Sequence, residues 1–162
     1  MQLVARLTET SVLWFSFVAT VLITIAFQVV IVVWDLVLLD GIADPEQARA
    51  AIAGMSEYQR NVHAWLTGTL DVVYPIAYGA LFIGSAYRFF PRLGWLLAIP
   101  TFVLVPVDLV EGVVQVLALT EVADWVSSKA ILTSLKQILF LAGFLITVCG
   151  WARWATSRLF GN

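Results

Sequence analysis

The sequence predicts an all-α integral membrane protein, a bundle of four transmembrane helices. Hydrophobic residues make up 61% of the chain and charged residues 12%, and the mean hydropathy is +0.93. Soluble domains have about half apolar and about a quarter charged residues. Four apolar runs are long enough to cross a hydrocarbon core of about 30 Å. We expect spans near 12–39, 57–87, 95–120 and 125–158, in a single domain covering 1–162.

Composition also excludes several classes of function. A net charge of −2, with nine dispersed Lys and Arg, argues against a nucleic-acid partner, which needs a clustered basic surface. The single His63 and the single Cys149 cannot build a zinc site of the usual nitrogen and sulfur kind. We therefore predict no metal and no cofactor. The first apolar run is too long for a cleaved signal peptide.

The first span is expected to be one long, tilted helix. Trp14 and Trp34 lie near its two ends, where interfacial tryptophans are common. Its polar residues recur at helical spacing and trace one face. They are Ser16, Thr20, Thr24, Gln28 and Asp35.

A short amphipathic helix is predicted in the first outer loop. Asp40-Gly41 ends the first span, and Asp44 can cap a new helix with Pro45 at its first position and Gln47 completing a capping box. This helix would lie across the outer mouth of the bundle, as a lid or as a plain connector. We favour the connector.

The second span carries a continuous polar stripe. Ser56 and Gln59 form a capping-box pattern at its start. Polar residues then follow at spacings of four, four, three and four. They are His63, Thr67, Asp71, Tyr74 and Tyr78. Pro75 would free a backbone carbonyl one turn earlier, near Asp71.

The third span contains two acids and an amide on one face. Asp108, Glu111 and Gln115 are spaced i, i+3 and i+7, so all three point in one direction. Pro100 and Pro106 are expected to kink this helix.

The fourth span supplies the matching positive charge. Asp124 can cap it, and Lys136 lies one heptad after Lys129, with Thr133 between them on the same face. Lys129 is expected at the outer boundary of the membrane and Lys136 deeper within it.

Charge in the loops predicts an N-in/C-in orientation. One side of the four-span bundle carries five arginines, whereas the opposite loops hold mainly acids, and positive charge favours the cytoplasm. The arginines are Arg6, Arg88, Arg92, Arg153 and Arg158. The outer acids are Asp40, Asp44, Glu46, Glu57, Glu121 and Asp124.

Counting inward at 1.5 Å per residue places the charges of four helices in one layer of the outer half. Asp35 comes out roughly 7 Å deep, Glu111 about 15 Å and Asp108 about 20 Å, with Asp71 and Lys136 at about 12 to 20 Å. Each unpaired charge at this depth costs roughly 2.5 to 3.5 kcal/mol on insertion scales. Four carboxyls facing one or two ammonium groups imply bound protons or a bound cation.

The chain resembles a widespread family of small bacterial four-transmembrane-helix proteins whose function is uncharacterised. The matching stretches are Asp44 to Ala48, Asp71 to Pro75, Pro106 with Asp108 to Glu111, and Thr133 to Lys136. The family often has Asn after the acid that matches Glu111, where this chain has Gly112. The resemblance implies four spans and a shared polar core but no activity. A looser similarity is to membrane domains of the sterol isomerase and sigma-2 receptor type.

Three functions fit these features. The first is an intramembrane acid/base site that binds or transforms a lipid-like or isoprenoid-like molecule, by isomerase, cyclase or hydrolase chemistry. The second is a transporter or sensor coupled to protons or cations. The third is a structural or accessory subunit in which ion pairs fix the helix register.

For the first function, roles can be assigned to individual residues. Asp108 and Glu111 would form the acid/base pair, with Asp71 as a second acid and Lys136 holding one of them ionised. The ligand-binding set is Asp35, Tyr74, Tyr78, Gln115, Gln28 and His63. The expected partners are membrane lipids and an apolar small molecule, and the chain could also form a homo-oligomer. The expected location is the bacterial cytoplasmic membrane.

Overall fold

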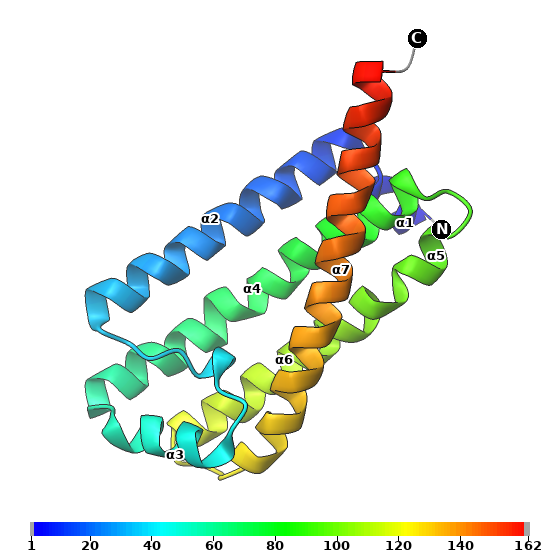
Figure 1. Ribbon diagram of the computed structural model, residues 1–162. Helices are drawn as coiled ribbons and strands as arrows, with labels where there is room; N and C mark the ends of the chain where they lie inside the picture. The colour runs from blue at the N-terminus through cyan, green and yellow to red at the C-terminus, as the bar shows by residue number, and fades with distance from the viewer. Residues whose placement is uncertain (1, 161–162) are drawn as a thin grey trace.

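The computed structural model describes residues 2–160, and within that range helices are joined by short loops and there is no strand. Figure 1 shows long helices side by side, with both ends of the chain at one end of the bundle. The elements are α1 (Gln2–Leu7), α2 (Thr10–Trp34), a 3₁₀ turn η1 (Leu39–Gly41), α3 (Pro45–Gly54), α4 (Glu57–Phe89), α5 (Gly94–Leu97), α6 (Ile99–Leu119) and α7 (Val126–Phe160).

Four of these segments are long and apolar enough to cross a membrane, as the sequence predicted. They are Thr10–Trp34, Glu57–Phe89, Gly94–Leu119 and Val126–Phe160. The expected end of the first span was wrong, because the helix stops at Trp34 and not near residue 39. Asp35 takes a left-handed conformation, with φ 48° and ψ 52°, and the N–H of Leu36 bonds back to Ile31. This conformation ends the helix.

The helices pack around α4, which contacts α2, α6 and α7. Close approach is possible because α4 and α7 carry glycines at the contacts: a Cβ at Gly79 would lie 2.7 Å from Val105, and one at Gly143 only 2.6 Å from Phe82. By contrast, α2 packs chiefly on α4 and diverges from α7 beyond the edge-on contact between Trp14 and Trp151 near its start (Figure 1). This separation leaves the bundle open along one side.

The prolines of the third span have different effects. The span is interrupted at Ala98, between α5 and α6, and Pro100 lies in the first turn of α6, where its missing N–H costs nothing. Pro75 and Pro106 lie inside uninterrupted helices. The kink expected at Pro100 is therefore a helix break.

The end of the bundle opposite the termini is closed by α3 and the loop before α7 (Figure 1). Asp44 caps α3 by accepting from the N–H of Gln47 at 2.8 Å, although no return bond from the Gln47 side chain completes a capping box within residues 2–160. At Ser56 the capping box is complete. Arg49 of α3 pairs with Asp124 at 3.0 Å, which ties α3 to the start of α7.

Candidate functional site

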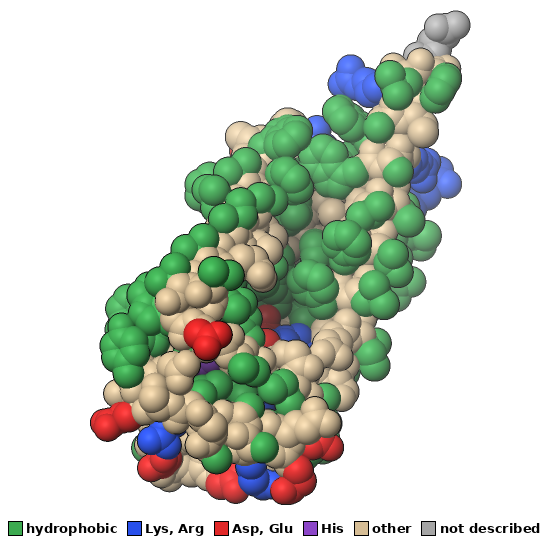
Figure 2. Space-filling view, turned by 60° about the vertical axis from the view of Figure 1, so that its left-hand side comes forward, with side chains coloured by type: hydrophobic (Ala, Val, Ile, Leu, Met, Phe, Trp, Pro, Cys, Tyr) green, Lys and Arg blue, Asp and Glu red, His purple; other side chains and the backbone are tan. Residues whose placement is uncertain are grey.

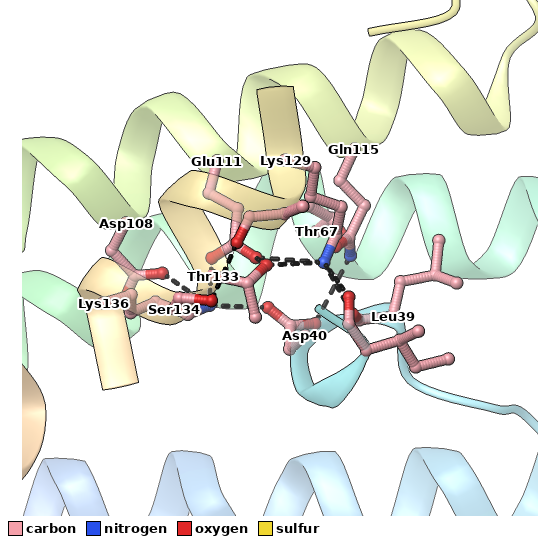
Figure 3. A network of polar contacts seen from close by, with 12 residues as sticks. Leu39, Asp40, Thr67, Asp108, Glu111, Gln115, Lys129, Thr133, Ser134 and Lys136 are labelled. Carbon is pink, nitrogen blue, oxygen red and sulfur yellow. Dashed lines mark hydrogen bonds and ion pairs between the residues drawn. The ribbon is translucent and has the colours of Figure 1, made fainter. Parts of the chain in front are cut away.

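A segment of the α2–α3 connection turns back into the bundle. We call residues 35–42 the strap. Lys129 of α7 donates to the carbonyl of Leu39 at 2.6 Å, and the N–H of Leu39 donates to Nε2 of His63 at 3.4 Å. Leu39 is fully buried. These contacts hold the strap against α4 and α7 and bring Asp40 among the charges of the bundle (Figure 3).

Glu111 lies between two lysines of α7. Its Oε1 is 3.0 Å from Nζ of Lys129, and its Oε2 is 2.5 Å from Nζ of Lys136. The hydroxyl of Thr133 also donates to Oε1. Glu111 is 1% exposed and Lys129 2% exposed, so this is a buried ion pair in which Oε1 of Glu111 accepts hydrogen bonds from Lys129 and Thr133. Such geometry is what a buried charge requires.

Lys136 faces three carboxylates. Its Nζ donates a hydrogen bond to Asp40 Oδ1 at 3.0 Å and lies 3.0 Å from Asp108 Oδ1. The contacts with Asp108 and Glu111 are close in distance but lack hydrogen-bond alignment. One ammonium group therefore links the strap to α6 (Figure 3).

The pKa of the Asp40 carboxyl, in the strap, is shifted from its ordinary value. Burial raises the pKa of Asp40, but the charge of Lys136 and hydrogen bonds from Lys136 and Gln115 outweigh burial and lower this pKa below its ordinary value of 3.8. Gln115 donates to Asp40 Oδ2 at 3.3 Å and to the hydroxyl of Thr67 at 3.0 Å. Asp40 is thus held as a carboxylate.

A row of hydroxyl groups leads away from the cluster. The Tyr78 hydroxyl donates to Asp108 Oδ2 at 2.5 Å, and Tyr78 is 1% exposed. The Tyr78 ring packs edge-on against Tyr74, with centroids 5.2 Å apart. The Tyr74 hydroxyl lies 3.1 Å from the Thr24 hydroxyl on α2. This row connects the charged cluster to the space between α2 and α7.

That space is a groove of about 680 Å³ with an apolar lining. Its walls come from α2, α4 and α7, and Tyr74 and Thr24 line it beside aromatic residues such as Trp14, Phe140 and Trp151. Figure 2 shows the hollow between two ridges of hydrophobic side chains, with acidic and basic side chains visible at its lower end. A volume in the range of about 300 to 1,000 Å³ suits a drug-sized ligand.

The structure brings most of the predicted site residues together. Asp71, Asp108, Glu111, Gln115 and Lys136 belong to one cluster, to which Tyr78 is bonded. Tyr74 lies between the cluster and the groove, and His63 holds the strap. Their chemical roles stay predictions.

Two predicted ligand-binding residues lie outside this cluster. Asp35 is exposed and ends α2, and Gln28 is exposed on α2. The depth expected for Asp35 assumed a helix continuing to residue 39. Because the chain reverses after Asp35, Asp40 takes the place that we expected for Asp35.

Sequence reasoning missed Asp40 and Lys129 as members of the cluster. Asp40 was expected at a helix end in the outer loop, and Lys129 at the membrane boundary. The heptad spacing of Lys129 and Lys136, with Thr133 between them, was the signal that could have placed Lys129. No pattern in residues 35–42 indicates that the strap turns inward.

Comparison with known proteins gives no relative: no family model, no curated protein and no solved structure matches this chain.

Proposed function

We propose that this chain is an integral membrane protein, N-in/C-in in the bacterial cytoplasmic membrane, that binds or transforms a lipid-like or isoprenoid-like molecule. The ligand enters sideways through the groove between α2 and α7. Its polar end reaches the cluster of carboxylates and lysines, and its apolar part lies along the groove. Asp40 and Lys129 join the residues expected from the sequence.

The observation that carries this proposal is an apolar groove beside a buried acid/base cluster. The groove alone would suit a structural lipid, and the cluster alone would suit a register-fixing ion pair. Together they offer what a site for an amphiphile needs, an apolar cavity with a few convergent polar groups. The tyrosine row supplies the connection, because Tyr74 lines the groove and Tyr78 contacts Asp108.

The chemistry follows from the order of groups along this row. Tyr78 and Asp108 share a short hydrogen bond, and Lys136 lies beside the other oxygen of Asp108. In this reaction Asp108 starts in its protonated form: the Tyr78 hydroxyl gives its proton to the ligand and takes the proton of Asp108, and Lys136 stabilises the Asp108 carboxylate that remains. Proton donation of this kind serves isomerase, cyclase or hydrolase reactions on alkenes or epoxides.

A groove-filling variant tests the proposal. Val148 lines the groove and is 46% exposed, so Val148→Trp occupies the ligand's space without disturbing the core. The wild-type protein, extracted in mild detergent, is expected to retain a stoichiometric apolar molecule in native mass spectrometry. Val148→Trp is expected to lose at least nine-tenths of it.

Val110→Trp is the matched control. Val110 is 52% exposed and does not line the groove, so the same substitution there leaves the ligand in place. Equal retention by both variants, or a wild-type protein carrying only bulk phospholipid, would contradict the groove as a ligand site.

A structural role is the second candidate, and the arrangement around Glu111 favours it. Glu111 binds two lysines of α7 through its two oxygens, which fixes α6 against α7. Buried ion pairs of this kind can specify packing without catalysis.

A further inference from the structure

A second opening reaches the acid cluster from another side of the bundle. It lies between α4 and α6, has a volume of about 290 Å³, and we call it the fissure. Its lining shares no residue with the groove between α2 and α7. Its polar lining includes Thr67 and Asp71, and its apolar lining includes Val72, Val113 and Val116.

Two glycines keep the fissure open. A Cβ at Gly68 would meet nothing within 4 Å. A Cβ at Gly112 would lie 3.7 Å from Asp71 Oδ2, so this carboxylate points toward α6 at the position where α6 has no side chain. Val72 and Val113 on the rim are 42% and 59% exposed. The fissure therefore leads from the apolar surface of the bundle, around Val72 and Val113, to the Asp71 carboxylate.

Asp71 differs from the other acids of the cluster in having no partner. It is 8% exposed, yet within residues 2–160 its side chain makes no hydrogen bond and no ion pair. The other three carboxylates are paired with Lys129 or Lys136. An oxygen of Asp71 also lies within 4.8 Å of oxygens of Asp40 and Asp108. A buried carboxylate in this setting lacks the positive group that such charges normally have.

We propose that the fissure is a second binding site, for an organic ammonium group with an apolar substituent, and that Asp71 is the carboxylate that pairs with it. The ammonium group donates hydrogen bonds to Asp71 and to the Thr67 hydroxyl. Its substituent lies on Val72, Val113 and Val116. The pairing supplies the positive charge that Asp71 lacks within residues 2–160.

A bare metal ion fits this place less well. Calcium takes about six to eight oxygen ligands, and magnesium keeps a nearly octahedral shell. At the fissure the Asp108 carboxylate already accepts from Tyr78 and lies beside Lys136, so Asp71 and the Thr67 hydroxyl are the oxygen ligands that remain. The remaining walls are apolar and match an organic substituent.

Thermal unfolding of the full chain in a non-ionic detergent tests the site, with hexylammonium chloride as the probe. Ligand that binds only the folded state raises the unfolding temperature with its concentration. The wild-type protein is expected to show a saturable rise with hexylammonium. Hexanol and ammonium chloride at equal concentrations are expected to give none, because one lacks the charge and the other lacks the apolar part.

Two variants locate the effect. Asp71→Asn is expected to weaken the apparent affinity for hexylammonium at least tenfold, and Gly68→Leu, which fills the fissure from α4, is expected to abolish the rise. Gly54→Leu is the matched control, because a Cβ at Gly54 of α3 also meets nothing within 4 Å and lies outside the fissure. Val148→Trp is expected to respond like the wild type, which separates this site from the groove.

The proposal fails if Gly68→Leu responds like Gly54→Leu, even where Asp71→Asn does not fold. It also fails if hexanol or ammonium chloride produces the wild-type rise. If hexylammonium raises the unfolding temperature of Gly68→Leu but not of Val148→Trp, the ammonium group binds in the groove and not in the fissure.

Discussion

At the scale of residues, two of the carboxyls in the cluster, Glu111 and Asp71, differ in whether they have a charged partner. Glu111 is held by Lys129, Lys136 and Thr133, whereas Asp71, on the neighbouring helix, has no partner within residues 2–160. Helical spacing on each span predicted both acids on inward faces, and the structure confirms their burial at 1% and 8% exposure. Spacing could not predict which acid meets which lysine, because that depends on the rotation of α7 against α6.

Neutralising the two acids is expected to have different effects on stability. Glu111→Gln leaves two buried lysines without their common partner and is expected to cost about 3 to 5 kcal/mol of unfolding free energy. Asp71→Asn replaces a buried carboxyl group that has no partner within residues 2–160 and is expected to be neutral or stabilising. The measurement is reversible denaturation in mixed micelles, with Glu46→Gln as control, since that side chain is 83% exposed.

The same measurement separates the two candidate functions. If Glu111→Gln and Asp108→Asn keep the wild-type stability, a purely structural ion-pair network is excluded. A loss for Asp71→Asn as large as that for Glu111→Gln would show that Asp71 has a stabilising partner, which contradicts its isolation.

At the scale of elements, the four long helices and the start of α3 were predicted by apolar length and capping residues, but the strap was not. The strap depends on contacts from elsewhere in the chain. Gln59 of α4 donates to the carbonyl of Asp35, and Lys129 of α7 donates to the carbonyl of Leu39. These partners are 24 and 90 residues away along the chain. Local sequence shows only that the helix ends before Gly41.

The contribution of the strap to stability is expected to fall at low pH. The pKa of Asp40 is lowered in the folded chain, so the folded chain keeps this carboxylate ionised at a pH where the unfolded chain has protonated it. The stabilisation is therefore complete above the ordinary aspartate pKa of about 3.9 and disappears as the pH falls through the lower folded value.

Comparison of wild type with Asp40→Asn checks this pH dependence. The wild type is expected to be the more stable at pH above about 5, with a difference that shrinks below about pH 4. A difference that stays constant down to about pH 2 would show that the Asp40 carboxylate does not supply it. Hydrogen exchange at residues 36–42 is expected to quicken in Asp40→Asn at neutral pH.

At the scale of the whole molecule, composition predicted the helical class and the number of apolar spans, and the structure confirms both within residues 2–160. The groove was not predictable in this way. It exists because α2 packs along α4 and diverges from α7 beyond the contact between Trp14 and Trp151. Helical periodicity reports which face of a helix is polar but not how far apart two helices stand. The aromatic residues that line the groove look, in sequence, like ordinary lipid-facing residues.

The orientation of the whole molecule in the membrane is predicted by the distribution of its charged residues. Arg88 donates to the carbonyl of Thr8 at 2.7 Å, so the arginine-rich end of α4 lies at the end of the bundle where α2 begins. The other end, around α3, holds the salt bridges of Glu46, Glu121 and Asp124. Positive charge near span ends favours the cytoplasm, so we expect the α3 end to face outward and the cluster to lie in the outer half of the membrane.

Single-cysteine variants in a Cys149→Ser background test this orientation in intact cells. If the α3 end faces outward as proposed, Gly54→Cys, at the end of α3, is expected to react with a membrane-impermeant maleimide without lysis. Ser157→Cys, in the last turns of α7, is expected to react only after permeabilisation. If Ser157→Cys reacts in intact cells and Gly54→Cys only after permeabilisation, the protein has the opposite orientation. The cluster then lies in the cytoplasmic half of the membrane, and its ligand arrives from the cytoplasmic leaflet. Reaction of both sites in intact cells would mean that the two ends of the bundle are not separated by a membrane.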